Sequence, residues 1–440
     1  MKYNTISKEE SNMKKLIPQS AKNIYHLFQA ILANVWFGFP SRKLKMIGVT
    51  GTNGKTTTCQ MISKILEENG AKVAMASTIN FKIGKREWVN DTKFTTFSSF
   101  RLQKFLRQAA DEACEYAIVE VTSHALDQNR VWGIQFSVAV LTNITREHLD
   151  YHKTMEEYAR AKEKLFAMAA KNPEGISVVN LGSEFAYNFL KHPVGKKYGY
   201  CIEHRVSSIE YGGIEIIEAK NIKLDIQNTQ YTIQNTQYSI NLPGEFNVEN
   251  ALAATCVGLS QGIPLEKISI ALGKIKGVPG RMEQIENNLG LTIIVDYAVT
   301  PDSLEKLYSY LDGIRKENGK VIAVFGSCGE RDRGKRPIMG EVVARHADYC
   351  IVTNEDPYNE DPQKIIDEVF EGVSKYKKEN MNAWRILDRR EAIKKALGMA
   401  RAGDIVVITG KGAEETMAVG EKRIPWNDPK IIREVLQESK

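Results

Sequence analysis

The chain has 440 residues, of which 42% are hydrophobic and 26% are charged, and its formal net charge is +6 at pH 7. This composition is typical of a soluble globular protein with two or three domains. The mild positive charge does not by itself indicate a nucleic-acid partner, because it would suit an anionic small substrate equally well, and we expect no nucleic acid. The six cysteines are far apart, which favours neither a zinc site nor a disulfide framework and indicates a reduced, cytoplasmic setting.

The first apolar stretch, residues 24–40, is interrupted by His26, Gln29 and Asn34. It falls short of the roughly 20 apolar residues that a membrane span needs, so we expect no integral membrane span. Its apolar residues repeat at helical spacing, which predicts a helix. We expect this helix to pack on the domain that follows, and a helix lying on a membrane surface is the alternative. The polar residues ahead of it do not resemble a signal peptide.

Residues 46–58, MIGVTGTNGKTTT, predict a strand, a glycine-rich turn and a helix that continues to 69. The backbone N–H groups of such a turn, together with the helix dipole, favour a polyphosphate. Lys55 would reach the terminal phosphates, and the Thr56 hydroxyl would reach magnesium. The usual pattern has glycine where this chain has Val49, but the flanking strand and helix favour a nucleotide loop over a non-nucleotide turn.

From 46 to about 180, short apolar runs alternate with helical patterns, which predicts a parallel sheet covered on both faces. The expected strands are 45–49, 72–77, 116–121, 136–143 and 176–180, with helices at 55–69, 99–112 and 154–171. Residues 196–242 contain QNTQY twice and predict a small antiparallel hairpin region. Helices are expected at 247–260 and 264–273, before a linker at 276–281.

A second alternation begins at 291 and predicts a doubly wound α/β domain. Its expected strands are 291–297, 320–326, 348–354 and 404–410, with helices near 301–316, 335–346, 363–377 and 389–400. The predicted fold class is therefore α/β, with a central P-loop-type parallel sheet, a Rossmann-like C-terminal domain and a short N-terminal helical segment.

Carboxylate and imidazole groups follow two of the expected strands: Glu120 and His124 in EVTSH, and His148 in TNITREHLDYH. These are ligand types that can hold a magnesium ion bridging nucleotide phosphates. A capping and turn segment is the alternative, and His152 fits a structural role equally well.

Several other polar side chains fit two interpretations each. Lys162, within the helical run YARAKEKLF, by itself predicts a lysine with a partly buried stem and a solvated ammonium group. Asn247 and Asn250 fit either a purine edge or a helix cap. Arg281 fits either a nucleotide clamp between domains or a surface ion pair. The cations of GERDRGKRP fit either an anion-recognition loop or a solvated charge run.

In order, these segments resemble the Mur ligases, the ATP-dependent ligases that build the peptide stem of bacterial peptidoglycan. The resemblance is closest to the MurE type, which adds the third residue, a diamino acid. It spans about 46–440 and rests on ten blocks: GTNGKTTT, EVTSHALDQNR, TNITREHLDYH, YARAKEKLF, GEFNVENALAA, GRME, VDYAVTPDSL, GERDRGKRP, NEDPYNEDP and GKGAEE.

The resemblance implies a reaction and its substrates. A carboxylate of UDP-N-acetylmuramoyl-L-alanyl-D-glutamate would attack the γ-phosphate of ATP, and the incoming amine would displace phosphate from the resulting acyl phosphate to form an amide. ATP and Mg²⁺ are the implied cofactors. The implied domains are a shortened N-terminal segment at 1–45, a central ATP-binding domain at 46–278 and an amino-acid-binding domain at 279–440. We expect a monomer.

The resemblance also assigns roles to the matching residues. It implies nucleotide contacts at Gly51, Thr52, Asn53, Gly54, Lys55, Thr56, Thr57, Asn247, Asn250, Arg281 and Asp296. It implies metal contacts at Thr56, Glu120, His148 and a carbamylated Lys162, with Lys55, Lys162, His148 and Glu120 as the catalytic set. It implies contacts to the muramoyl dipeptide at Thr95, Thr96, Thr122, Gln128 and Arg130, and to the incoming amino acid at Arg331, Asp356, Gly410 and Glu414.

The sequence departs from the family pattern in four places. About 50 residues precede the nucleotide loop, where the family has a UDP-binding domain of about a hundred residues. Three explanations stay open: the uridine is held less tightly, the 24–40 helix substitutes for the domain, or the substrate carries a different group in place of UDP. The DNPR motif of diaminopimelate-adding enzymes is EDPY at 355–358, which favours a diamine such as lysine or ornithine over diaminopimelate. Val299 and Ala413 replace two family histidines, and Glu147 replaces an aspartate.

Two alternative functions stay open. One is a ligase resembling folylpolyglutamate synthase, which shares the nucleotide loop and the carbamylated lysine but not EVTSHALDQNR. The other is a catalytically silent nucleotide-binding partner of a cell-wall enzyme, suggested by the short front segment and the lost histidines. The intact Lys55, Glu120 and Lys162 argue against this second alternative.

Overall fold

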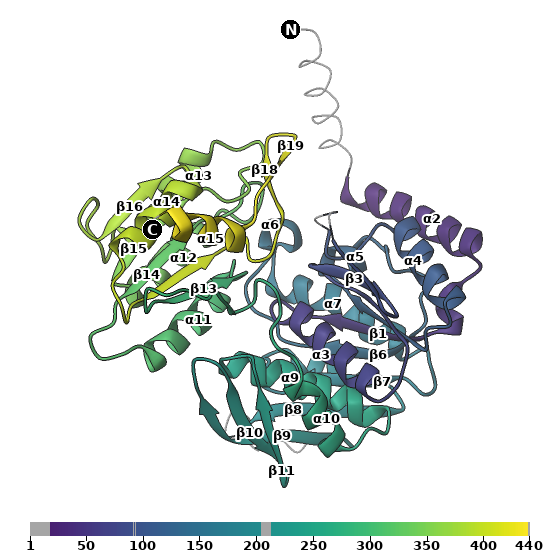
Figure 1. Cartoon of the computed structure of the whole chain (residues 1–440). Helices are drawn as coiled ribbons and strands as arrows, with labels where there is room; N and C mark the ends of the chain where they lie inside the picture. Colours follow the sequence, from purple (N-terminus) through teal and green to yellow (C-terminus); the bar gives the residue numbers. More distant parts are fainter. Residues whose placement is uncertain (1–17, 91, 93, 204–212, 439–440) are drawn as a thin grey trace, which may run out of the picture.

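The computed structural model describes residues 18–438 except 91, 93 and 204–212, and it has two lobes, each built on one large sheet. Figure 1 shows the central lobe in purple to teal and the C-terminal lobe in green to yellow. The two sheets are flanked by helices, which confirms the predicted α/β class. Within the described residues, no helix is long and apolar enough to cross a membrane.

The central sheet has eleven strands in the order β11-β10-β9-β8-β7-β6-β1-β5-β2-β3-β4. Its seven middle strands, from β9 to β2, run parallel, which agrees with their apolar runs being buried on both faces. The strands at the two ends of the sheet pair antiparallel. The bounds are β1 Lys45–Thr50, β2 Val73–Ala76, β3 Asn80–Ile83, β4 Arg86–Val89, β5 Tyr116–Glu120, β6 Phe136–Leu141, β7 Ile176–Asn180, β8 Lys196–Ile202, β9 Glu215–Leu224, β10 Thr229–Ile233 and β11 Thr236–Ile240.

Helices cover both faces of this sheet, as predicted. One core packs α3, α9 and α10 against residues such as Ile47 and Val49 of β1, and a second core packs α4, α5, α7 and α8 on the opposite face, where Met46 points. The helix bounds are α2 Gln19–Phe37, α3 Lys55–Glu68, α4 Ser99–Asp111, α5 Ser123–Asp127, α6 Leu149–His152, α7 Met155–Ala169, α8 Ala186–Leu190, α9 Glu245–Ser260 and α10 Leu265–Gly273, with the 3₁₀ turn η1 at Pro40–Lys43.

The hairpin region expected at 196–242 is only partly antiparallel. β8 and β9 both run parallel to the main sheet, so this region extends that sheet, and only β9, β10 and β11 form an antiparallel meander. The repeated QNTQY segments form the last hairpin, where Tyr231 lies opposite Tyr238 with ring centroids 5.0 Å apart. The duplication therefore supplies a buried cross-strand aromatic pair.

The C-terminal sheet has the strand order β12-β13-β17-β14-β15-β16 and is parallel apart from β12. Its apolar strands form one core with α11, α12 and α13 and another with α14 and α15. The bounds are β12 Glu283–Gln284, β13 Thr292–Asp296, α11 Pro301–Ile314, β14 Val321–Phe325, α12 Lys335–His346, β15 Tyr349–Thr353, α13 Pro362–Val373, β16 Ala383–Ile386, α14 Arg389–Met399, β17 Ile405–Thr409, β18 Thr416–Val419, β19 Lys422–Pro425 and α15 Asp428–Glu438.

The N-terminal helix differs from its prediction. It spans Gln19–Phe37 rather than 24–40, and it ends at Gly38 in the left-handed conformation. It packs beside α4, as expected, but Ala30, Ala33 and Asn34 form the buried side rather than the large apolar residues. The Asn34 amide, one of the polar interruptions in the sequence, donates 2.8 Å hydrogen bonds to the carbonyls of Ala30 and Trp132.

Candidate active site

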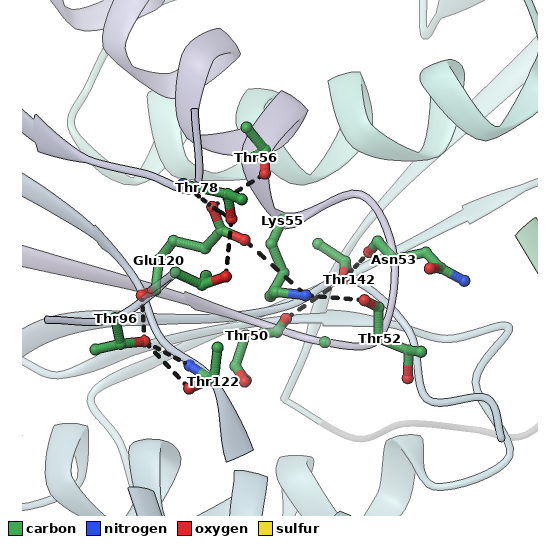
Figure 2. A network of polar contacts seen from close by, with 12 residues as sticks. Thr50, Thr52, Asn53, Lys55, Thr56, Thr78, Thr96, Glu120, Thr122 and Thr142 are labelled. Atoms are coloured by element: carbon green, nitrogen blue, oxygen red, sulfur yellow. Dashed lines mark hydrogen bonds and ion pairs between the residues drawn. The ribbon is translucent and has the colours of Figure 1, made fainter. Parts of the chain in front are cut away.

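The nucleotide loop lies at the centre of the large sheet, between the carboxyl end of β1 and the first turn of α3. Lys55 begins the helix, and its ammonium group donates to the Thr52 carbonyl at 2.8 Å. Glu120 ends β5 directly beside β1 and places a carboxylate oxygen 4.0 Å from the same nitrogen (Figure 2). Burial lowers the pKa of Lys55, and the negative charge of Glu120 opposes this.

The Glu120 carboxylate is surrounded by hydroxyl groups. Its Oε2 accepts hydrogen bonds from the hydroxyls of Thr56 at 3.0 Å and Thr78 at 2.9 Å, and from the Thr78 backbone N–H at 2.8 Å (Figure 2). A carboxylate in contact with the first-turn threonine of a phosphate loop is a hard oxygen donor set of the kind that suits Mg²⁺. Thr56 and Glu120 therefore fit their predicted role.

Lys162 is fully enclosed, with 2% of its surface exposed. From α7 its Nζ donates a 2.7 Å hydrogen bond to the Gly51 carbonyl of the nucleotide loop, and it lies 4.6 Å from the centre of the Tyr158 ring. The expectation of a solvated ammonium group is therefore wrong. Burial, followed by the positive charge of Lys55, lowers the pKa of Lys162 well below its ordinary value. Lys162 is thereby biased toward its neutral, nucleophilic form.

Three histidines cluster beside the loop. The rings of His124 and His148 meet edge to face with centroids 4.6 Å apart, and His152 pairs with the Ser123 hydroxyl at 3.0 Å, which fits a structural role. Burial lowers the pKa of His124 to about 3 and that of His148 well below its ordinary value, so both are neutral. Among the residues the structure describes, no group of three or more His, Cys, Asp or Glu side chains is placed to hold a metal. Glu120 and His148, the two predicted metal residues with side chains of these kinds, therefore belong to no such group.

A cavity of about 80 Å³ lies between the nucleotide loop and the C-terminal lobe. Seven of the predicted nucleotide residues line it: Asn53, Gly54, Thr57, Asn247, Asn250, Arg281 and Asp296. The two asparagines are buried and do not cap α9. Asn247 donates to the Pro243 carbonyl at 2.8 Å, and Asn250 donates to the Asn247 amide oxygen at 3.1 Å.

Arg281 joins the two lobes. Its guanidinium lies 4.6 Å from the centre of the Tyr297 ring, and one nitrogen lies 3.4 Å from the Thr56 hydroxyl. The neighbouring Asp296 carboxylate accepts a 2.8 Å hydrogen bond from the Met282 backbone N–H, which fixes the chain beside the arginine. The interpretation of Arg281 as a surface ion pair is therefore wrong.

A second cavity, of about 660 Å³, opens beside His124 and His148. All the residues predicted to contact the muramoyl dipeptide line it: Thr95, Thr96, Thr122, Gln128 and Arg130. Arg331, predicted to contact the amino acid, lines it as well, and so do His26 and Gln29 of α2. Burial lowers the pKa of Arg130 to about 10, and its guanidinium is oriented by a 2.9 Å hydrogen bond to the Thr96 carbonyl.

The other residues predicted to contact the incoming amino acid lie around Lys411, whose role the sequence pattern did not indicate. The buried Lys411 ammonium group donates to Asp356 at 2.7 Å and to Glu414. Gly410 packs against the Glu355 carboxyl group, whose pKa burial raises to about 7. The motifs NEDP and GKGAEE contain these residues, but nothing in their spacing indicated that one lysine would join both loops.

A third cavity, of about 100 Å³, lies where the lobes meet and is lined by Thr78, Thr95, Arg281, Tyr297 and Glu414, among others. Thr95 lines both this cavity and the 660 Å³ cavity, and Arg281 lines both this one and the 80 Å³ cavity. The cavity between the lobes therefore shares a wall with each of the other two, and of the three only the 80 Å³ cavity is lined by residues of the nucleotide loop.

The cationic loop 331–336 matches neither interpretation alone. Lys335 is buried and forms a 3.1 Å ion pair with Glu147 of the central lobe, whereas Arg336 is buried and pairs with Glu360 and Glu368 of its own lobe. Asn53 of the nucleotide loop also donates to Asp302 of α11 at 2.9 Å. The loop thus places Arg331 at the 660 Å³ cavity, while Lys335 forms an ion pair between the two lobes.

Two family models match the chain: the Mur ligase middle domain over residues 49–258, and the Mur ligase glutamate ligase domain over residues 280–412. A UDP-N-acetylmuramyl-tripeptide synthetase of Roseiflexus sp. (strain RS-1) is 40% identical over 421 residues, covering 93% of this chain and 82% of that protein.

A UDP-N-acetylmuramoyl-L-alanyl-D-glutamate–2,6-diaminopimelate ligase of Syntrophomonas wolfei is 37% identical over 409 residues, covering 93% of this chain and 81% of that protein. A solved structure of a ligase with the same name is 31% identical, with a TM-score of 0.58, and covers 90% of this chain and 79% of that one. These matches favour the Mur ligase prediction over the alternative resembling folylpolyglutamate synthase. The chain belongs to the Mur ligase family, whose members are ATP-dependent ligases that form amide bonds.

Proposed function

We propose that this chain is a MurE-type ligase of peptidoglycan precursor synthesis, which adds a diamino acid to UDP-N-acetylmuramoyl-L-alanyl-D-glutamate in the cytoplasm. The 100 Å³ cavity between the lobes carries this proposal, because Thr95 also lines the 660 Å³ cavity and Arg281 also lines the 80 Å³ cavity. The 660 Å³ cavity is the acceptor cavity, which takes the dipeptide. The residues that line the 80 Å³ cavity contact the adenosine, and the amine enters through the 100 Å³ cavity between the lobes. An acceptor carboxylate and an incoming amine would then meet beside the terminal phosphate.

ATP and Mg²⁺ would supply the phosphoryl group and neutralise its charge, and the protein would position them. Lys55 and the loop N–H groups bind phosphate oxygens, while the Thr56 hydroxyl and the Glu120 carboxylate hold the metal. Arg130 orients anionic groups of the acceptor in the acceptor cavity, and Arg331, which also lines this cavity, binds the carboxylate of the incoming amino acid. Neutral His148 faces the same cavity and can accept a proton or bind the metal.

Carbamylation of Lys162 is part of the proposal. A neutral, buried amine is the form that attacks carbon dioxide, and the lowered pKa of Lys162 favours it. The new N–C bond gives a carbamic acid, which releases a proton to water and becomes an anion beside the nucleotide loop, where it would support a second magnesium. Protein incubated with ¹³C-bicarbonate should give a carbamate signal in ¹³C NMR that Lys162→Ala removes. Ligation should be lost in this variant and partly restored by a short carboxylic acid.

For the amino acid, we propose lysine or ornithine. Tyr358 stands where diaminopimelate-adding enzymes have arginine, and it packs 5.7 Å from the Arg331 guanidinium instead of offering a cation. The rival is diaminopimelate, the amino acid in the names of two relatives. The deciding assay measures phosphate release with L-lysine, L-ornithine and meso-diaminopimelate. A strong preference for diaminopimelate would overturn the choice of amino acid but not the ligase.

The same assay tests the ligase itself and its acceptor. Muramoyl dipeptide with and without UDP should be compared as acceptors. If ADP bound but no amino acid released phosphate with either acceptor, the chain would be a silent nucleotide-binding partner. Light scattering across concentrations should find the monomer that we propose.

A further inference from the structure

Helix α2 presents an apolar face that no other described part of the chain covers. Its small and polar residues pack inward, whereas six large side chains on its outer side are 45–79% exposed: Ile24, Tyr25, Phe28, Leu32, Val35 and Trp36. At 100° per residue these six positions fall within an arc of about 120°, so they form one continuous stripe. We call this stripe the outer face of α2. Figure 1 shows α2 at the edge of the central lobe, beside α4 and away from the C-terminal lobe.

Cations border the outer face. Residues 18–45 contain Lys22, Arg42, Lys43 and Lys45 but no aspartate or glutamate. The exposed Arg101 and Lys104 on α4 add to this border.

Three acidic residues near this border are already paired: Asp127, which accepts a hydrogen bond from Asn23 of α2, with Lys164, Asp111 with Arg107, and Glu115 with Lys45. The border is therefore positive, and an anionic partner would complement it.

We propose that the outer face of α2 docks on an anionic phospholipid membrane surface. Apolar and aromatic side chains on one side of a helix, bordered by lysine and arginine, suit the boundary between headgroups and acyl chains, where tryptophan and tyrosine rings are favoured. Arg42 and Lys43 directly follow the helix at the end that carries Trp36 and can reach lipid phosphates.

A second copy of the chain is a poorer occupant of this face. A two-fold symmetric pair would bring the same cationic borders together, and like charges across an interface disfavour association. A lipid surface supplies both the apolar layer and the negative charge. Docking in this way would place the acceptor cavity near the membrane, because His26 and Gln29 on the adjoining side of α2 line it.

The test measures co-sedimentation of the full chain with vesicles of phosphatidylcholine alone or mixed with phosphatidylglycerol. The wild-type chain should bind the mixed vesicles, bind phosphatidylcholine far more weakly, and lose binding in high salt. Phe28→Gln/Trp36→Gln should weaken binding at least tenfold. Arg42→Gln/Lys43→Gln should weaken it by about fivefold for each cation.

The matched control is Tyr187→Gln/Ile270→Gln, which removes two exposed apolar side chains, 71% and 61% exposed, from other parts of the central lobe. This control should bind like wild type, and all variants should keep the wild-type thermal midpoint, since every altered side chain is exposed. Trp36→Phe should retain binding while losing the blue shift of tryptophan fluorescence on vesicles.

Two results would overturn the proposal. One is the absence of a preference for the mixed vesicles, in which the wild-type chain binds neither kind of vesicle or binds both kinds equally. The other is a dimer that Phe28→Gln/Trp36→Gln dissociates while vesicles do not bind, which would assign the outer face to a second copy.

Discussion

Glu355→Gln should remove a pH-dependent weakness of the C-terminal lobe. Glu355 is buried at the carboxyl end of the parallel sheet, and its Oε2 has no hydrogen-bond partner among the residues that the structure describes. Burial raises its pKa from an ordinary 4.5 to about 7, while the charges of Arg389 and Lys411 oppose the rise. The folded chain therefore binds a proton more tightly than the unfolded chain, and stability falls as pH rises from about 4.5 through 7.

The size of the effect follows from the two pKa values. At 1.36 kcal/mol per pH unit, the penalty reaches about 3 kcal/mol at pH 8, of which about 2 kcal/mol develops between pH 5.5 and pH 8. The glutamine variant keeps the shape of the side chain but cannot ionise, so it should lack this slope. It should be more stable than wild type at pH 8.

Hydrogen exchange during urea unfolding, followed in peptides from β15 and β17, reads the C-terminal lobe separately from the other lobe. Glu341→Gln is the matched control, because Glu341 is an exposed carboxylate whose pKa is lowered by a hydrogen bond from Lys375. Glu341 is ionised throughout pH 5.5–8 and should leave the slope unchanged. Equal slopes for wild type and Glu355→Gln would refute the reasoning.

Two further predictions concern the contacts around the nucleotide loop. Lys335→Met leaves Glu147 buried without its partner, so it should lower the free energy of unfolding by about 3 kcal/mol and increase the radius of gyration in X-ray scattering. The control Lys375→Met breaks a pair at the surface and should cost under about 1 kcal/mol. An unchanged radius and stability in Lys335→Met would contradict the role of the Lys335–Glu147 pair. Gly54→Ala should weaken ADP binding at least tenfold in calorimetry, because Gly54 has φ +81° and a Cβ there would lie 2.1 Å from the Asn250 side-chain oxygen. Gly70→Ala, at φ +92° with open space around it, should bind ADP normally, and equal affinities in the two variants would contradict the steric argument.

Local pattern was sufficient for most of the parallel strands and for the nucleotide loop, and tertiary packing decided the rest, including the parallel direction of β8 and β9. A continuous apolar run such as 46–49 is specific for a buried strand, whereas the hairpin of β3 and β4 was missed because Arg86–Val89 is an exposed edge strand without that signal. β16, the β18–β19 hairpin and α15 were missed for a similar reason, since their patterns are short or strongly polar.

Burial of charged side chains was the least predictable property. The sequence places Lys162 among alanines, but only the fold shows that its ammonium group points inward to the Gly51 carbonyl. The α2 helix illustrates the opposite case: its apolar spacing predicted burial, and Ala30 and Ala33 were buried instead. Which face of an amphipathic helix meets the domain depends on the partner surface, and one sequence window does not contain that surface.

The connection at 277–281 restricts where the lobes can pivot. Gly280 has φ +65°, and a Cβ there would lie 2.1 Å from the Ala413 backbone nitrogen, so this glycine is packed onto the C-terminal lobe and would move with it. Gly277 has open space around it and can absorb a change of backbone angle. A pivot at Gly277 would carry Arg281 and Tyr297 together as one body. Such a swing would pull the guanidinium away from the Thr56 hydroxyl, so opening of the two halves would begin by disturbing the phosphate end of the nucleotide site.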